Sequence, residues 1–529
     1  MKQKYTRLKI FILALALVSL LYANKLSNST YSNTNSGVAH DNLASQEASK
    51  DNQTSNTKPS TVGSSSNISD SDVAIPSKLV DGVNQKRYFA LSNPNDPYFA
   101  TAWYLNSVNA PPAWATTTGS ASVTVADIDT GFALSHQDLS SHWKLNSADP
   151  VDSVDNDSNG LVDDNKGWDF ANGDSSPQAG ATNPSGGGVS HGTETAGLIG
   201  AVGNNGVGTT AIAQNVSILP LQVLEDNGSG YSDDVASAIT YAVDQGANVI
   251  NMSLGTSGDD PVVRQAVDYA YNNNVVVVAA AGNCGNPGTS GPCSGQVTGY
   301  ITFPASYNRV LAVGASTSTN ARASFSSYGD RLDVVAPGSG TIVSPTWTSG
   351  NGTSAYATSL AGTSYASPIV ASSVALVKAI RPSTSVDDIR ALLMAGASKV
   401  SGMSGSFYST SYGHGLLDVG NIVTVANELN GKTERVPALS QAGGLAAEHG
   451  YDSSDTIGSG CTTDIGLWCT VWFRDSSTNN ERYLPYKKIG ASGKVGWNFS
   501  SGVLGHGYWE ARARDGGTVS DTPYSLFRK

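Results

Sequence analysis

Short apolar runs alternate with longer stretches of helical periodicity from about residue 95 to residue 429. Six runs have the length and composition of strands, and they lie at residues 123–128, 217–223, 248–253, 275–281, 310–315 and 332–336. Several of them are continuously apolar, which indicates strands that are buried on both faces. Helical patterns lie between them, at residues 191–201, 232–245, 260–273 and 364–380. This alternation predicts an α/β fold with a doubly wound, mostly parallel sheet and helices on both faces.

The pattern differs at the N-terminus, where a basic stretch at residues 2–9 precedes an apolar run at residues 10–22. This run has roughly 13 residues, fewer than the roughly 20 that span a bilayer. Residues 1–23 are therefore predicted to be a secretory signal peptide. The alternative is an uncleaved membrane anchor that tethers the protein to the cell surface. Residues 24–80 are mostly Ser, Asn, Thr and Asp, which predicts a disordered polar linker.

Beyond residue 430 the pattern changes again. Residues 431–458 have the composition of a loop and are predicted to be a linker. Residues 459–529 contain short alternating stretches, which predict a small C-terminal all-β domain. Its four tryptophans are interpreted as core residues, with a recognition surface for carbohydrate or protein as the alternative.

The charge balance is acidic, with a formal net charge of -12 from 31 basic and 43 acidic residues. The only basic run is the one at the N-terminus, so a nucleic-acid partner is not expected. The cysteines form two close pairs, Cys284 with Cys293 and Cys461 with Cys469. In an exported chain this favours a disulfide within each pair. A metal site on these cysteines is the weaker alternative, because no histidine lies close to either pair in sequence.

A hydroxyl residue stands at the start of the most apolar predicted helix. The sequence from residue 362 to residue 368 is Gly-Thr-Ser-Tyr-Ala-Ser-Pro. Ser364 is thus placed at a helix N-terminus, where free N–H groups and the dipole favour developing negative charge. Taken alone, it would be interpreted as an ordinary helix cap. Only polar partners from elsewhere in the chain can change this interpretation.

Three polar residues occupy positions where such partners are expected, because parallel sheets bind ligands beyond the carboxyl ends of their strands. Asp129 follows the predicted strand at residues 123–128, and Asn283 follows the one at residues 275–281. His191 opens a predicted helix among small residues. Each of the three, taken alone, is typical of a turn, a loop cap or a helix cap.

Taken together, the segments around Asp129, His191, Asn283 and Ser364 resemble, in sequence and in chain order, the motifs of the subtilisin-like serine proteases. The resemblance covers residues 95–429. It includes further family signatures at residues 136–139, 228–231, 253–255 and 412–415.

The resemblance implies a role for each of these residues. Ser364 would attack the peptide carbonyl, His191 would take its proton, and Asp129 would hold the histidine and stabilise the imidazolium. Asn283 would stabilise the oxyanion together with the Ser364 N–H. The substrate-binding residues implied by the family are Gly228, Gly230, Tyr231, Ser253, Leu254, Gly255, Ala281 and Gly282. The small size of the pocket residues predicts a broad, mainly apolar or aromatic preference.

Three features depart from the family pattern. Tyr365 stands where the family most often has methionine, and Gln137 where it often has proline. Neither residue is itself one of the catalytic groups. Many secreted members also carry a folded pro-segment, but the only apolar part of the interval before the catalytic domain, residues 73–91, is too short for an independent core.

An acidic segment at residues 155–164 reads Asp-Asn-Asp-Ser-Asn-Gly-Leu-Val-Asp-Asp. Such oxygen ligands around a glycine turn suit a hard cation, and similar loops are calcium sites in the subtilisin-like family. Lys166 stands in the place of the bidentate glutamate of an EF-hand, so a helix-loop-helix site is excluded. The alternative is a solvated acidic turn. The candidate ligands of a structural calcium ion are Asp155, Asp157, Asn159, the carbonyl of Leu161, Asp163 and Asp164.

The sequence therefore predicts a secreted serine endopeptidase with its catalytic domain at residues 81–430, acting as a monomer on protein or peptide substrates. If the first segment stays in the membrane, the catalytic domain would be anchored on the extracytoplasmic side. Two other functions stay open: a catalytically silent binding protein that uses the C-terminal domain, and a processing protease with one partner substrate.

Overall fold

The computed structural model describes residues 93–180, 189–286, 291–348 and 351–430. Beyond these it describes the shorter stretches 438–440, 450–451, 456–462, 468–475, 478–489, 494–500, 507–515, 518–519 and 524–528. The predicted signal peptide and polar linker, at residues 1–23 and 24–80, lie outside the described residues. So does most of the linker predicted at residues 431–458.

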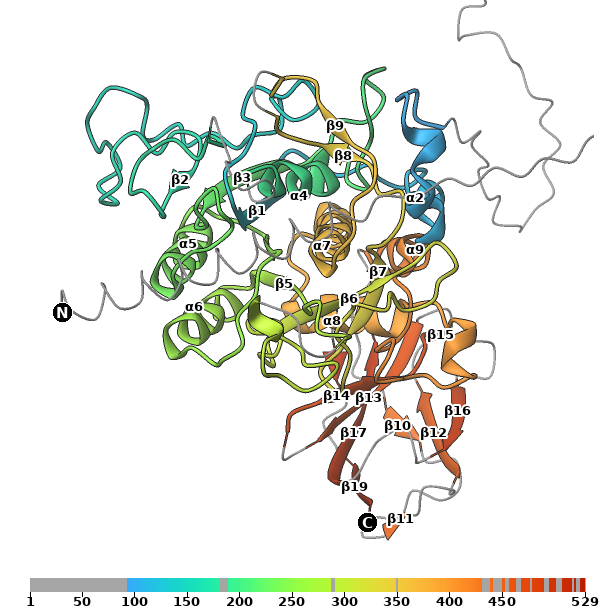
Figure 1. The fold of residues 1–529 in the computed structure, drawn as a ribbon. Helices are drawn as coiled ribbons and strands as arrows, with labels where there is room; N and C mark the ends of the chain where they lie inside the picture. The colour runs from blue at the N-terminus through green and yellow to red at the C-terminus, as the bar shows by residue number, and fades with distance from the viewer. Residues whose placement is uncertain are drawn as a thin grey trace, which may run out of the picture. The chain divides into compact units, whose positions relative to one another are not determined.

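Seven parallel strands form the central sheet (Figure 1). In spatial order they are β2 (Trp168–Asp169), β3 (Ser217–Gln222), β1 (Thr124–Asp129), β4 (Val249–Met252), β5 (Val276–Ala280), β6 (Val310–Ser316) and β7 (Val334–Pro337). All six predicted strands are present, and the parallel sheet is confirmed. The two-residue strand β2 was not predicted, because it is too short to give an apolar pattern. Strands follow outward on both sides of β1, which therefore lies at the switch point where such sheets bind ligands.

Helices cover both faces of this sheet. One hydrophobic core is shared by the sheet with α2 (Trp103–Ser107), α3 (Ala110–Ala113), α4 (His191–Gly200), α7 (Thr363–Ile380), α8 (Val386–Gly396) and α9 (Val419–Leu429). A second core is shared with α5 (Ser232–Asp244) and α6 (Pro261–Asn272). Along β5, Val276 and Val278 belong to the first core, and Val277 and Ala279 to the second. This two-residue alternation explains why the strand is apolar throughout.

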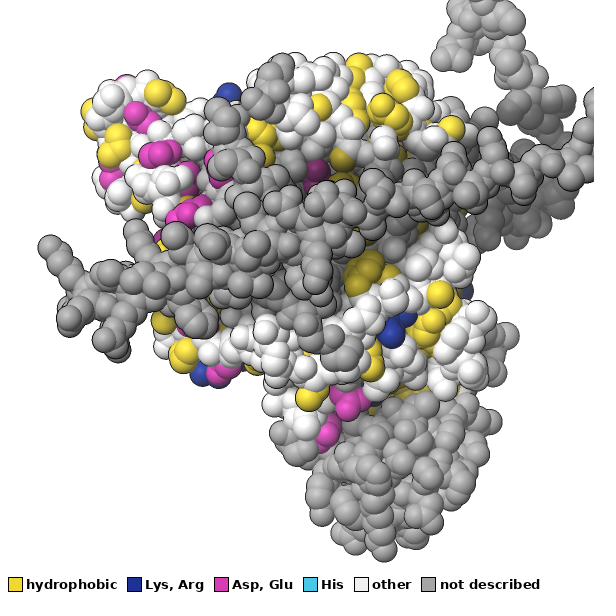
Figure 2. Space-filling view, in the orientation of Figure 1, with side chains coloured by type: hydrophobic (Ala, Val, Ile, Leu, Met, Phe, Trp, Pro, Cys, Tyr) yellow, Lys and Arg dark blue, Asp and Glu magenta, His cyan; other side chains and the backbone are white. Residues whose placement is uncertain are grey.

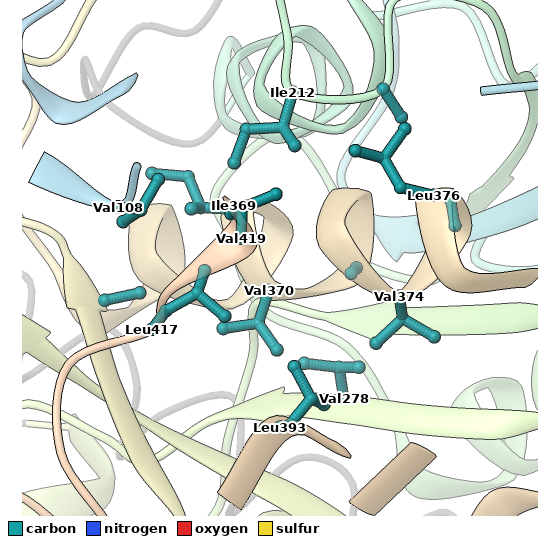
Figure 3. Close-up of a cluster of buried hydrophobic side chains, with 14 of the residues drawn as sticks. Val108, Ile212, Val278, Ile369, Val370, Val374, Leu376, Leu393, Leu417 and Val419 are labelled. Carbon is teal, nitrogen blue, oxygen red and sulfur yellow. The ribbon is translucent and has the colours of Figure 1, made fainter. Parts of the chain in front are cut away.

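The long helix α7 passes through the first core. In Figure 3, Val370 and Val374 face Val278 of β5 and Leu393 of α8, while Ile212 lies on the opposite side of the helix. Among the described residues, α7 is the one helix long and apolar enough to pass as a membrane span, but 83% of it is buried inside the fold. It is therefore a core helix. Its packing fixes the position of the residues in its first turn.

Smaller elements complete the part before residue 430. They are the 3₁₀ turns Phe99–Thr101, Gly291–Cys293 and Ser401–Met403, and a hairpin of β8 (Ser344–Pro345) with β9 (Tyr356–Ala357).

The C-terminal part is all-β, as predicted. One sheet contains β10 (Ala438–Ser440), β12 (Thr456–Thr462) and β16 (Lys494–Ser500). A second contains β11 (Gly450–Tyr451), β19 (Tyr524–Arg528), β17 (Gly507–Asp515), β13 (Trp468–Asp475) and β14 (Glu481–Tyr483), with β15 (Lys487–Lys488) beside β13 and β18 (Thr518–Val519) beside β17. These pairs are antiparallel except β11 with β19. The boundaries at residues 430 and 459 stay a prediction.

Candidate active site

A buried carboxylate and a histidine meet at the switch point of the sheet. Asp129 is the last residue of β1 and is fully buried, and its Oδ1 accepts a hydrogen bond from the Thr130 N–H at 2.7 Å. His191 is the first residue of α4, and its Nδ1 lies 2.7 Å from the same Oδ1. The His191 side chain is 21% exposed. With Nδ1 held by the carboxylate, Nε2 is the nitrogen left for proton transfer.

The charges around His191 favour its protonated form. Burial is the largest single cause and lowers the pKa of His191, but the charge and hydrogen bond of Asp129, together with the charges of Glu194 and Asp127, raise it to about 9. The same cluster raises the pKa of Asp127 to about 8, first through burial and then through the Asp129 charge. The site therefore stabilises a positive charge on the imidazole.

Ser364 is the second residue of α7 and is half-buried. Its Oγ donates to the Ser253 carbonyl at 3.1 Å, and Ser253 Oγ donates back to the Ser364 carbonyl at 2.7 Å. Within the described residues, no hydrogen bond joins Ser364 Oγ to His191. The structure thus brings the carboxylate and the imidazole into direct contact and leaves the serine hydroxyl on a neighbouring carbonyl.

Asn283 is exposed and follows β5 closely. Its Oδ1 accepts hydrogen bonds from the Thr363 N–H at 3.0 Å and from the Thr363 hydroxyl at 3.1 Å. Thr363 directly precedes Ser364, so these bonds tie the asparagine to the first turn of α7. They leave Nδ2, the donating end of the amide, for another partner.

A cleft of about 1000 Å³ opens beside Asn283 and Ser364. Six of the eight predicted substrate-binding residues line it, namely Gly228, Gly230, Tyr231, Leu254, Gly255 and Gly282. Ala281 is fully buried, and Ser253 is engaged with Ser364 instead of lining the cleft. For these two, the predicted contact with substrate has no support in the described residues.

The cleft also contains residues that the sequence did not single out. Thr302, Phe303 and Tyr307 line it. A Cβ atom on Gly255 would lie 2.5 Å from Thr302 Oγ1, and one on Gly282 would lie 2.8 Å from Thr302 Cγ2. Both predicted pocket glycines therefore lie against Thr302 and not against open space. Thr302 does not belong to any motif, so its position in the cleft could not be predicted from the sequence.

The predicted disulfide between Cys284 and Cys293 is present. Cys284 follows Asn283 directly, and Cys293 lines the cleft. Cys469 is also disulfide-bonded. The side chain of its expected partner, Cys461, lies outside the described ones, so the second pairing stays a prediction.

Acidic side chains gather over the surface near residues 145–164, at the upper left of Figure 2. Asn159 Nδ2 donates to Asp157 Oδ2 at 3.2 Å and to Asp164 Oδ2 at 2.8 Å, and Asp164 is fully buried. Asp155 accepts the N–H groups of residues 159 and 160. Asp163 turns toward the N–H groups of residues 152 and 153. In the part of the chain that the structure describes, no three acidic, histidine or cysteine side chains converge as a metal site requires, so calcium is not confirmed.

The doubly wound fold, with a carboxylate–histidine pair beside a serine at a helix start, is that of a serine peptidase. The chain belongs to the subtilase family, whose model matches residues 120–415, and it is a serine endopeptidase. Thermitase of Thermoactinomyces vulgaris is 38% identical over 318 residues, which are 60% of this chain and 95% of that one. Subtilisin DY of Bacillus licheniformis is 39% identical over 299 residues, 56% of this chain and 90% of its own. A solved protease structure from Pseudoalteromonas arctica matches with a TM-score of 0.50 at 32% identity, over 63% of this chain and all of that one.

Proposed function

We propose that this chain is an exported endopeptidase that hydrolyses peptide bonds through an acyl-enzyme at Ser364, with His191 as general base and Asp129 as its partner. The 2.7 Å hydrogen bond between Asp129 and His191 carries the proposal, and Tyr365, the residue that follows Ser364, packs its ring against the His191 ring. Such a bond fixes the imidazole tautomer and leaves Nε2 for the serine proton.

The reaction begins when Ser364 Oγ releases the Ser253 carbonyl and turns toward His191. Its oxygen bonds to the peptide carbonyl carbon while its proton passes to Nε2. The carbonyl oxygen gains the negative charge, and the Ser364 N–H and Asn283 Nδ2 donate to it. The carbon–nitrogen bond then breaks, and the leaving amine takes the proton from His191. Water repeats both proton transfers to release the acid and restore Ser364.

Substrate would bind in extended form along two backbone segments, residues 228–231 and residues 253–255, as an added strand. Most of these residues line the cleft. We expect a broad, mainly apolar preference, since the described pocket lining near Ser364 consists of small and uncharged residues such as Gly255, Gly282 and Thr302. Thr302 would limit the depth available to large side chains.

We also propose that the acidic loop holds a structural calcium ion. Asn159 Nδ2 lies within hydrogen-bond distance of both Asp157 and Asp164, and Asp155 accepts the Asn159 N–H in the same turn. The carboxylate oxygens of the three aspartates and the amide oxygen of Asn159 are of the type that calcium prefers. Asp163 is a weaker candidate because its carboxylate is used by two backbone N–H groups. The ion would offset the repulsion among these carboxylates and take no part in the reaction.

Digestion of casein by the wild type and by Ser364→Ala tests the function. We expect the variant to lose activity by a factor on the order of 10⁶, as for other serine nucleophiles. Circular dichroism would verify that the variant is folded. Equal digestion by both proteins would contradict the proposal and favour a silent binding protein.

Two further observations decide where and on what the enzyme acts. N-terminal sequencing of the mature protein distinguishes a secreted monomer from a membrane-anchored form. Cleavage of a peptide library distinguishes broad specificity from a processing protease with one partner substrate, for which a single sequence would dominate.

A further inference from the structure

A second buried carboxylate lies one helical turn from His191. Glu194 belongs to the first turn of α4 and is 6% exposed. Its Oε1 accepts a hydrogen bond from the Thr346 hydroxyl, and its Oε2 accepts one from the Tyr365 hydroxyl, both at 2.7 Å. A carboxylate that is buried with a donor on each oxygen is held in one orientation. Its charge therefore has a fixed position relative to the imidazole.

Tyr365 connects this carboxylate to His191 and directly follows the proposed nucleophile. It directly follows Ser364 in α7, and its side chain is buried. The centre of its ring lies 5.6 Å from the centre of the His191 ring, at an interplanar angle of 51°. The residue therefore contacts the imidazole through its ring and Glu194 through its hydroxyl. These contacts give a role to Tyr365, the one residue in the nucleophile segment that departs from the family pattern.

We propose that Tyr365 and Glu194 are a coupled pair of positioning residues for His191: the tyrosine ring holds the imidazole in place, and the glutamate charge stabilises the imidazolium formed during the reaction. The inference rests on the proposed function of His191 as the general base. Neither residue would touch substrate. Thr346 completes the arrangement by fixing the other oxygen of Glu194.

The groups that face His191 come from three elements. Asp127 and Asp129 face it from β1, Glu194 from its own helix, and Tyr365 from α7. Asp129 acts through a direct hydrogen bond. Glu194 acts through space, so removing its charge should change the protonation of His191 without breaking the Asp129 bond. Removing this charge should lower the pKa of His191, whereas a change in packing predicts no particular direction for that pKa.

The two members of the pair should therefore respond in opposite directions. Glu194→Gln keeps the size of the side chain and removes the charge, so we expect the acid limb of kcat/KM to move to lower pH by about half a unit or more. Tyr365→Phe keeps the ring and removes a donor that partly neutralises Glu194. The acid limb should then move to higher pH. A role confined to packing would lower activity in both variants and leave the limb unmoved.

Asp138 and Tyr356 offer a matched control. Asp138 is buried and accepts a hydrogen bond from the Tyr356 hydroxyl at 3.2 Å, which repeats the chemistry of the proposed pair away from the imidazole. Asp138→Asn should lower the melting temperature but leave the pH profile unchanged. If Glu194→Gln and Asp138→Asn give the same acid limb as the wild type, the proposal is wrong.

A second readout separates this proposal from the proposed function. The imidazole of His191 can be titrated by NMR in the inactive Ser364→Ala background, where its signal is identified by its loss in His191→Ala. A lower pKa in Glu194→Gln supports the positioning role even if the chain proves to have another activity. An unchanged pKa overturns the role even if the chain is an active peptidase.

Discussion

At the scale of single residues, His191 is surrounded by negative charge. The carboxylates of Asp129 and Glu194 favour the imidazolium, and Asp127, whose own pKa is raised to about 8, adds to them where it is ionised, so the pKa of His191 rises to about 9 despite its burial. A general base must be deprotonated before it can act. A raised pKa therefore moves the acid limb of kcat/KM upward, so we expect activity to increase with pH well above 6.5, the ordinary value for histidine. A pH series with a short peptide substrate measures this, and a profile that is already flat at pH 6 would contradict it.

Thr302 gives a second prediction at this scale. Thr302→Gly removes the side chain that lies against Gly255 and Gly282. We expect kcat/KM for substrates with Phe or Tyr at the primary position to increase by about tenfold relative to Ala, the lower end of the effect of one methylene in an apolar pocket. Peptides that differ only at this position provide the measurement. Thr302→Val keeps the volume and is the matched control, in which the ratio should change little.

The residues proposed for the chemistry could be selected from sequence motifs, and their roles stay a prediction, whereas the walls of the cleft could not be predicted. Asp129, His191, Asn283 and Ser364 each stand in a short motif whose position relative to a strand or helix is legible. Thr302 and Thr346 stand in no motif. They reach the cleft and Glu194 only because distant segments fold over them, and 152 positions separate Thr346 from Glu194 in the chain. Pairings of that kind follow from tertiary packing, which periodicity does not encode.

At the scale of elements, six of the seven strands of the sheet were predicted because each lies in an apolar run, and helices α4, α5, α6 and α7 were predicted from their periodicity. Helices α8 and α9 were not predicted, although both begin with a clear signal. Ser385 accepts the Asp388 N–H at the start of α8, and Asp418 accepts the Asn421 N–H at the start of α9. These are N-caps of the usual residue types. A search for caps in addition to apolar periods would have found them.

The acidic loop at residues 155–164 gives a prediction about thermal stability. If calcium binds there, chelator should lower the melting temperature by several °C, because a ligand at about 100 times its Kd contributes about 2.7 kcal/mol. Asp157→Asn should remove most of this sensitivity. Asp152→Asn is the control in the same loop, since its carboxylate accepts the Val154 N–H and contacts none of the proposed ligands. Thermal unfolding with and without chelator decides the matter, and equal melting temperatures for the wild type would exclude a structural ion.

At the scale of the whole molecule, the C-terminal part contacts the catalytic fold through buried polar groups. His414, in one of the family signatures, accepts the Tyr483 N–H at 3.0 Å through Nε2, while its Nδ1 lies 3.0 Å from the Asp333 carbonyl. Burial is the first cause that lowers the pKa of His414 well below its usual value, so the ring stays neutral and can accept this bond. This contact could not be predicted, because the signature that contains His414 belongs to the catalytic domain and no motif marks Tyr483 as its partner.

Arg390 of α8 forms an ion pair with the hairpin of β13 and β14, which contains Tyr483. It is 2% exposed, its Nη2 lies 3.4 Å from Asp333 Oδ1 of the catalytic fold, and its Nε lies 3.3 Å from Glu481 Oε2 of β14. A buried guanidinium needs carboxylate partners, because an unpaired charge in the interior is costly. The hairpin of β13 and β14 therefore supplies one of the two carboxylates that pair with this buried guanidinium. The C-terminal part thus contributes to the stability of the catalytic fold.

Glu481→Gln tests this connection. The change keeps the size of the side chain but removes the charge opposite Arg390, and Asp333 remains as the second partner. We expect the free energy of unfolding to decrease by about 2–3 kcal/mol, less than the 3–5 kcal/mol typical of a buried pair that loses its only partner. Urea unfolding of the full chain provides the measurement. Asp268→Asn is the control, because its ion pair with Arg309 is exposed on both sides and should contribute less than about 1 kcal/mol. A loss for Glu481→Gln no greater than this control would mean that the catalytic fold does not depend on the hairpin for its stability.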